Sequence, residues 1–307
     1  MPKVSIACEE DRYSTVTTAL TNIYDDIENS IRNKAKIVIK PNFVCDNVPL
    51  CATQIDTTRA VIDFLLQFNP KEVCIAEGSS QSATTAFKNY NYLQLRQQYG
   101  IELIDLDDDD YDEVEIFTRE RNGFGTTRIR VAKTIIEADY RISEAVLKTH
   151  DTVVVTLSLK NMVMGAVLDK RKMHQGYRAI NLNLYKIAKL IPVHLAVIDG
   201  WEGMEGNGPV SGTPVDAHVA LASINFVAAD IIATKLLGFD PTEIGYLQYA
   251  TGKYGFSPLG TGAISNVKLV GKPLKEVQQR FQPHKDYLEQ KNWHIPSNML
   301  TKVLETM

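Results

Sequence analysis

Short runs rich in β-branched residues alternate with stretches of helical spacing along this chain, and this alternation constrains its fold more than any other feature. VSIAC at 4–8 and KIVIKPN at 36–42 have the composition of strands, whereas apolar residues recur at helical spacing over 57–68. EVCIAEGSS at 72–80 and HLAVIDG at 194–200 continue the strand pattern. This order is typical of an α/β fold with a largely parallel or mixed sheet flanked by helices.

The length of 307 residues fits one large domain or two modest ones. No internal repeat or low-complexity linker divides the chain. We therefore expect a single composite α/β domain over residues 1–307. In the alternative arrangement, two lobes meet near residue 146 and the site lies between them.

Composition excludes several classes of partner. Hydrophobic residues make up 44% of the chain, charged residues 23%, and the net charge is −4. These values are ordinary for a globular protein and give no reason to expect nucleic acid or a membrane as partner. Apolar runs fall short of the roughly 20 residues of a spanning helix, and the N-terminus lacks a signal-peptide pattern. We predict a cytoplasmic protein and leave a homo-oligomer open.

The cysteines do not have the spacing of a cluster or a disulfide framework. Cys8, Cys45, Cys51 and Cys74 form no CxxC motif. We therefore expect no iron–sulfur cluster. Cys45 and Cys51 are close enough in sequence to act as ligands, although a free cysteine is more often a small buried apolar residue.

Polar side chains follow several of the predicted strands. Lys40 and Asn42 come after one strand, and Lys148 and His150 come after another. Ligands of open α/β sheets bind beyond the carboxyl ends of the strands. These residues therefore predict one rim of a binding site.

The turn GSSQSATT has features of an anion site. Gly78 allows close approach of the backbone, Ser79 and Ser80 offer hydroxyls, and a helix is expected to follow. The alternative interpretation is a helix N-cap within a run of serines.

Lys148 and Lys160 are the two cations that bracket an apolar run in LKTHDTVVVTLSLKN. Lysine is rarely buried without a partner, so we expect both to reach an anionic ligand, an acid or solvent. A desolvated lysine beside another cation has a lowered pKa, which suits proton abstraction. His150 is a candidate acid–base group or metal ligand, and a structural histidine is the alternative.

Two further basic residues are candidates for binding an anion. His174 follows the basic patch 170–172, which is interpreted as a loop tip or as a lid over a phosphate or carboxylate. Arg59 lies at a predicted helix start, where it would clamp a carboxylate or form an exposed salt bridge.

The segment DGWEGMEGNGPVSGTP, residues 199–214, is predicted to be a long loop because of its glycines and prolines. Asp199, Glu202 and Glu205 are candidate ligands of a divalent metal, and Glu205 is also a candidate general base. A glycine loop with solvated acids is the alternative.

KPNFV, AEGSS, LKTH, VTLSLKN and DGWEGMEGNGPVSGTP occur in this order, and the chain thereby resembles the prokaryotic family called domain of unknown function 362 over about residues 36–250. The resemblance implies that the following match characteristic positions: Lys40, Asn42, Lys148, His150, Lys160, Asn161, Glu205, Gly206, Gly208 and Pro209. Several relatives are labelled iron–sulfur proteins, but this chain has no CxxCxxC run, so the label does not transfer. A looser similarity to nickel-pincer lactate racemase-like proteins is an analogy only.

Together these features predict an enzyme that acts on a small phosphate- or carboxylate-bearing metabolite, as an isomerase, racemase or transferase. The predicted catalytic residues are Lys148, His150, Lys160 and Glu205. The predicted ligand-binding residues are Lys40, Asn42, Arg59, Gly78, Ser79, Ser80, Asn161, His174, Gly206 and Gly208. One alternative is a non-catalytic protein that binds a metallocofactor or ligand and partners a redox system. Another is that the polar residues merely cap strands.

Overall fold

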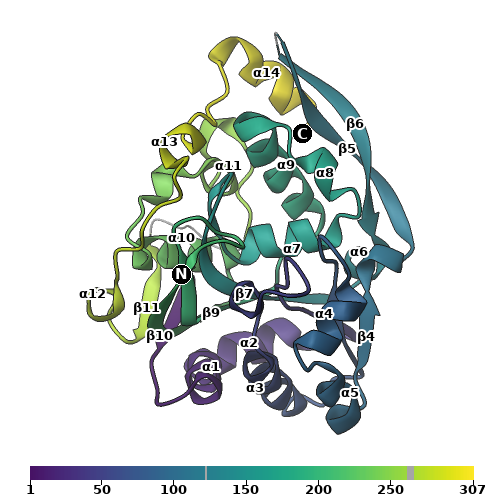
Figure 1. Ribbon diagram of the computed structural model, residues 1–307, viewed down its shortest axis with the longest axis vertical. Coiled ribbons are helices and arrows are strands. Elements are labelled where there is room, and N and C mark those ends of the chain that lie inside the picture. Colours follow the sequence, from purple (N-terminus) through teal and green to yellow (C-terminus); the bar gives the residue numbers. More distant parts are fainter. Residues whose placement is uncertain (122, 261–265) are drawn as a thin grey trace.

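The computed structural model describes residues 1–121, 123–260 and 266–307, and its centre is a nine-stranded mixed sheet (Figure 1). All the strands of the structure, including β5 and β6, which lie outside this sheet, are β1 (Lys3–Ala7), β2 (Lys36–Lys40), β3 (Glu72–Glu77), β4 (Glu102–Asp105), β5 (Tyr111–Glu120), β6 (Gly123–Ala132), β7 (Tyr140–His150), β8 (Val154–Thr156), β9 (Leu195–Glu205), β10 (Thr213–Ser223) and β11 (Lys268–Gly271). The order in the sheet is β11-β1-β10-β9-β7-β2-β3-β4, and β8 pairs with β7.

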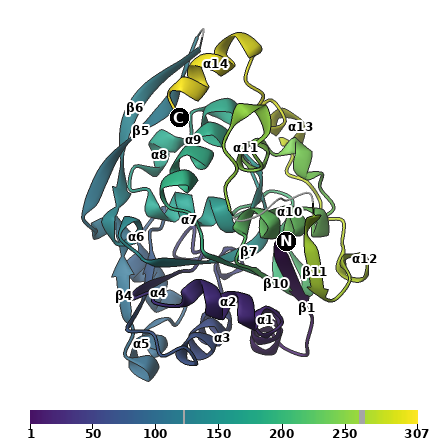
Figure 2. The ribbon, with the colours of Figure 1, turned by 180° about the vertical axis from the view of Figure 1, so that it is seen from behind.

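Helices cover both faces of this sheet. They are α1 (Arg12–Thr21), α2 (Tyr24–Ile31), α3 (Ile55–Leu66), α4 (Ala83–Asn89), α5 (Leu93–Tyr99), α6 (Lys133–Ile136), α7 (Ser158–Ala166), α8 (Lys170–Met173), α9 (Gly176–Leu190), α10 (Phe226–Leu236), α11 (Gly245–Ala250), α12 (Leu274–Val277), α13 (Tyr287–Gln290) and α14 (Ser297–Glu305). Helices α1, α2 and α3 lie below the sheet, and α7, α9 and α10 lie above it (Figures 1 and 2). The α/β class expected from the sequence is confirmed.

Strand alternation explains why two helical layers form. Ile37 and Ile39 of β2 belong to the core beneath the sheet, whereas Val38 belongs to the core above it. Side chains of a strand point alternately to opposite faces, so the continuous apolar run IVI of β2 (KIVIK) needs cover on both sides. The buried strands of this chain therefore require a three-layer arrangement.

The order of the strands places a switch point at β2. The chain runs outward from β2 to β3 and β4, and then returns to pair β7 with the opposite edge of β2. Both pairings of β2 are parallel. The carboxyl ends of β2, β3 and β7 thus lie side by side, which is where ligands bind in open α/β sheets. Residue 146, suggested as a lobe boundary, falls inside β7.

Residues 199–214 do not form the predicted long loop. Strand β9 continues to Glu205 and β10 begins at Thr213, so most of the segment is an antiparallel hairpin. The glycines serve close packing: a Cβ at Gly200 or Gly203 would lie 2.8 Å from an atom of Leu147. The prediction was wrong because close packing of strands needs glycine as much as a turn does.

Strands β5 and β6 form a separate two-stranded sheet that lies along α9 (Figure 1). The side chain of Asn183 on α9 fixes this hairpin to the helix by two hydrogen bonds with the backbone of Phe117. Its amide accepts from the N–H of Phe117 at 2.8 Å and donates to the carbonyl of Phe117 at 2.8 Å. Within the three described ranges, every helix is too short or too polar to cross a lipid bilayer.

Candidate functional site

The candidate site is a cavity of about 210 Å³ at the carboxyl ends of β2, β3 and β7. Its walls come from these strand ends, from α7, and from the segments around residues 44, 80 and 209. Eight residues predicted from the sequence line it: Lys40, Asn42, Gly78, Ser80, His150, Lys160, Asn161 and His174. The parallel strands explain this convergence, since they bring positions far apart in sequence to one edge.

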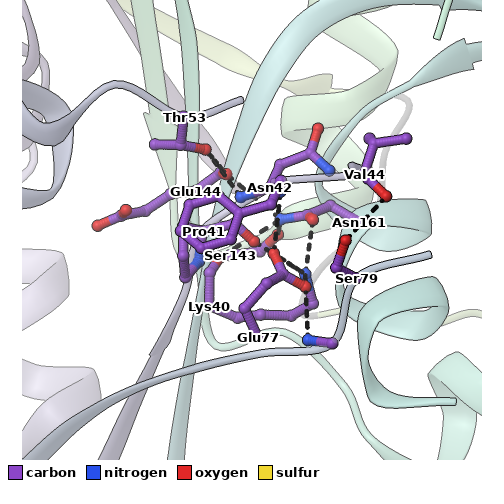
Figure 3. Close-up of polar contacts among 12 residues, drawn as sticks. Lys40, Pro41, Asn42, Val44, Thr53, Glu77, Ser79, Ser143, Glu144 and Asn161 are labelled. Carbon is purple, nitrogen blue, oxygen red and sulfur yellow. Dashed lines mark hydrogen bonds and ion pairs between the residues drawn. The ribbon is translucent and has the colours of Figure 1, made fainter. Parts of the chain in front are cut away.

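Lys40 lines the cavity, and every proton of its amine is used in a hydrogen bond with the protein (Figure 3). Its amine donates to the carbonyl of Pro41 at 2.8 Å, to Asn161 Oδ1 at 2.7 Å and to Glu77 Oε2 at 3.0 Å. An ammonium group has three protons, so all of them are used. Lys40 therefore organises the cavity and has no proton left with which to bind an anion.

Burial disfavours the charged forms of both Lys40 and Glu77, which form an ion pair. It lowers the pKa of Lys40 and raises the pKa of Glu77, while the attraction between the two groups acts against both shifts. Breaking such a buried pair on one side is strongly destabilising, because it leaves an unpaired charge in the interior. Asn161 completes the cluster by donating to Ser143 Oγ at 3.0 Å.

Helix α7 supplies Lys160, which differs from Lys40 in having no protein partner. Its side chain is only 6% exposed, and it makes no hydrogen bond or ion pair with any residue that the structure describes. Burial lowers the pKa of Lys160 to about 7. The carboxylate of Asp151, which also lines the cavity, acts against this shift, and the charges of Lys148 and Lys40 act with it. An amine with this pKa is present in both protonation states near neutral pH.

Two neutral polar atoms in the cavity wall also lack partners. Asn42 Oδ1 and Thr156 Oγ1 are buried without a hydrogen bond to any described residue. Asn42 stands beside the Lys40 cluster in Figure 3, and both residues line the cavity. Buried polar groups are almost always hydrogen-bonded in native proteins. Together with the amine of Lys160, these two atoms lack hydrogen-bond partners among the described residues, and a small polar ligand would supply them.

His150 is neutral at physiological pH. Burial and the nearby charge of Lys160 lower its pKa to about 3. Its Nδ1 lies 2.9 Å from Asp151 Oδ1 and 3.0 Å from the backbone nitrogen of Thr152, two partners that require opposite tautomers. The imidazole is therefore an uncharged polar group in the cavity wall.

Lys148, predicted to be catalytic, does not line the cavity. It is completely buried, and its amine donates to the carbonyl of Cys51 at 2.5 Å. Burial lowers the pKa of Lys148 to about 8. The amine of Lys148 thus binds the backbone of the segment between β2 and α3 and stabilises it there.

Four other predicted ligand-binding residues also lie outside the cavity lining. Arg59 pairs with Asp56 on α3 at 2.5 Å. Ser79 Oγ donates to the carbonyl of Val44 at 3.2 Å. Gly206 has a positive φ of 72°, and a Cβ at Gly208 would lie 2.3 Å from the carbonyl oxygen of Thr149, so both glycines shape the turn between β9 and β10. The neighbouring Pro209, joined by a cis peptide bond, does line the cavity.

The three acids predicted to bind a metal are not assembled into one site. Asp199 Oδ2 accepts from Thr57 Oγ1 at 2.6 Å and lies 3.2 Å from Arg12 Nε. Glu205, also a predicted catalytic residue, accepts from the backbone N–H of Gln282 at 2.7 Å. In residues 1–121, 123–260 and 266–307, no group of three His, Cys, Asp or Glu side chains is arranged to hold a metal. Alternation along β9 separates acids that sit three positions apart.

Sequence reasoning missed Thr156 and Asp151 as cavity residues, and named Lys170 only as part of a basic patch. Lys170 belongs to the basic patch, and its amine contacts Asp107 Oδ1 at 2.5 Å. Thr156 ends the apolar run that forms β8, and a hydroxyl at the end of a buried strand was the available signal. The antiparallel pairing of β8 with β7 brings Thr156 opposite Lys148, a contact that no local pattern specifies.

Comparisons with known proteins identify relatives of this chain. Residues 37–235 match the model of a family described as Domain of unknown function (DUF362). A thylakoid-associated protein of Synechocystis sp. is 27% identical, over 75% of this chain and 71% of that protein. The lactate racemase apoprotein from Thermoanaerobacterium thermosaccharolyticum has a TM-score of 0.46 and 11% identity, over 76% of this chain and 56% of that one. The chain thus spans about half of that protein, and a likeness at this level carries no functional argument.

Proposed function

Since the chain belongs to the family described as domain of unknown function 362, whose description names no activity, we propose a function from the cavity itself. The protein binds a small organic anion there, with Lys160 as the cation that meets it. One observation carries this proposal: Lys160 is only 6% exposed, and its amine makes no hydrogen bond or ion pair with the described residues. A largely buried lysine without a direct partner is costly, and a bound anion reduces that cost.

The size and polarity of the cavity limit the ligand. Its volume of about 210 Å³ is smaller than the roughly 300–1,000 Å³ of sites for drug-sized ligands. Asn42 Oδ1 is an acceptor without a donor, so the ligand is expected to carry a hydroxyl or another donor besides its anionic group. A small hydroxyl-bearing carboxylate or phosphate meets both requirements.

Lys160 is also the proposed proton-transfer group. A group transfers protons most effectively when its pKa is close to the working pH, and the pKa of Lys160 is about 7. His150, which is neutral and lines the cavity, is the proposed hydrogen-bonding partner of the ligand. Proton transfer at carbon would make the protein an enzyme of the isomerase or racemase type. The cytoplasmic location expected from the sequence stays a prediction.

Binding is tested by calorimetric titration with inorganic phosphate, glycolate and acetate. Glycolate and acetate form a matched pair that differs by the hydroxyl expected to meet Asn42, so glycolate should bind more tightly. Lys160→Met should weaken binding at least about tenfold, which is the effect of losing one charged hydrogen bond. Arg59→Gln is the control, since Arg59 lies outside the cavity lining, and should bind as the wild type does. Equal affinities of the wild type and Lys160→Met would refute the proposal.

Catalysis is tested separately from binding. The protein is incubated with glycolate in D₂O, and NMR follows loss of the carbon-bound hydrogen signal. Exchange by the wild type and by Arg59→Gln, but not by Lys160→Met, would support proton transfer. Binding without exchange would contradict the enzymatic part and favour a ligand-binding protein without turnover.

A further inference from the structure

Two free cysteines lie against each other in the segment that joins β2 to α3. The Sγ atoms of Cys45 and Cys51 are 3.3 Å apart, and the two residues are 5% and 0% exposed. A disulfide bond is about 2.05 Å long, so a modest movement of the sulfurs would join them. Neither cysteine lines the cavity, so an inference about this pair is independent of the proposed function.

The surroundings of the two sulfurs differ. Cys51 Sγ also lies 3.0 Å from the carbonyl oxygen of Val48 and 3.2 Å from that of Phe43, so its single thiol proton has acceptors besides Cys45. The hydrogen bond from Cys51 lowers the pKa of Cys45 to about 6, whereas the same contact and burial raise the pKa of Cys51. The charge of Lys148, whose amine contacts the carbonyl of Cys51, favours a thiolate at this place. One sulfur is thus prepared to attack and the other keeps its proton.

We propose that Cys45 and Cys51 form a reversible two-electron redox couple, which hydrogen peroxide oxidises to a disulfide. The thiolate of Cys45 attacks one peroxide oxygen, the O–O bond breaks, and the leaving hydroxide takes a proton to become water. Cys45 is then a sulfenic acid. The sulfur of Cys51 attacks the sulfur of Cys45 and expels hydroxide, which takes the proton of the Cys51 thiol and leaves as a second water. Two thiols and one peroxide thus give one disulfide and two waters.

The arrangement separates this pair from the other two cysteines. Cys74 is buried at 2% exposure, and burial raises its pKa to about 12. Burial also raises the pKa of Cys8, which is half-buried. Reactivity toward peroxide follows the fraction of thiolate, so Cys45 should react first. Cys45 and Cys51 are therefore the reactive pair, and Cys45 carries the attacking sulfur.

The test uses the full wild-type chain, reduced, freed of reductant and treated with one equivalent of hydrogen peroxide. Trypsin cleaves after Lys36 and Arg59 but not between Lys40 and Pro41, so both cysteines fall in the one peptide 37–59. That peptide should lose about 2 Da and regain it with dithiothreitol, as an internal disulfide does. The peptides with Cys8 and Cys74 are internal controls and should not change.

Two variants assign the order of the steps. In Cys51→Ser the sulfenic acid of Cys45 has no partner, so dimedone should label peptide 37–59. In Cys45→Ser labelling should fall at least about tenfold, because the remaining thiol of Cys51 is 0% exposed and burial still raises its pKa. Stronger labelling in Cys45→Ser would overturn the assignment of the attacking sulfur. An unchanged mass of the wild-type peptide, a gain of about 16 Da without the loss, or a disulfide between two chains would overturn the couple itself.

Discussion

Gly165 of α7 has no side chain in the space that the Lys40–Glu77 pair occupies. Gly165→Ala should therefore lower the free energy of unfolding of the protein. A Cβ at this position would lie 1.9 Å from Lys40 Cε, 2.4 Å from Lys40 Nζ and 2.5 Å from Glu77 Oε1. Lys40 has little freedom to move aside, because its amine is held by three hydrogen bonds. Loss of one side of a buried ion pair costs about 3–5 kcal/mol. Alanine gains about 1 kcal/mol over glycine in a helix, so the net loss should be about 2–4 kcal/mol.

Urea unfolding followed by circular dichroism measures this loss as a lower midpoint at an unchanged slope. Gly123→Ala is the matched control, since a Cβ at Gly123 has no described atom within 4 Å. The control should stay within about 0.5 kcal/mol of the wild type. A Gly165→Ala protein as stable as the control would refute the packing of α7 against the Lys40 cluster.

Two further changes test buried carboxyl groups by urea unfolding. Burial raises the pKa of Glu144 to about 8, so the folded protein keeps a proton that the unfolded chain loses above about pH 4.3. Stability should fall between pH 5 and 8 by up to about 1.4 kcal/mol per pH unit, and Glu144→Gln should remove that slope; an unchanged slope would contradict the assignment. Asp230 accepts from the backbone N–H groups of Ser158 and Leu159, so Asp230→Ala should cost about 2 kcal/mol by uncapping α7. A loss below about 0.5 kcal/mol would refute that role.

Local patterns in the sequence were sufficient to predict the α/β class and the rim of the site. Apolar runs such as 36–42 indicated strands buried on both faces, and the strand-end rule selected Lys40, Asn42 and His150, which the fold brings to one cavity. The prediction worked because these residues follow directly from strand boundaries.

The function of each polar side chain depended on contacts between distant segments. Lys40 and Lys160 look alike in sequence, yet Asn161 and Glu77 saturate the first, while the second has no described partner. Lys148 is directed away from the cavity by the carbonyl of Cys51, 97 positions earlier in the chain. No spacing rule reports which lysine finds a partner, since pairing is decided by tertiary packing.

The acids of the metal prediction are separated for a similar reason. Acids in a glycine-rich stretch suggest a flexible loop that gathers ligands, but residues 199–205 continue strand β9. Six positions of extended strand separate Asp199 from Glu205, so Asp199 contacts Thr57 while Glu205 contacts the backbone N–H of Gln282.

Proton uptake on binding of glycolate at pH 8 tests the central role of Lys160 most directly. With a pKa of about 7, nearly nine-tenths of the Lys160 amines are neutral at this pH, and a bound carboxylate should return them to the charged form. Calorimetric titrations in two buffers of different ionisation enthalpy measure the uptake, to which glycolate contributes nothing near pH 8. The account predicts close to nine-tenths of a proton for the wild type and none for Lys160→Met. No uptake by the wild type, or equal uptake by both proteins, would contradict it.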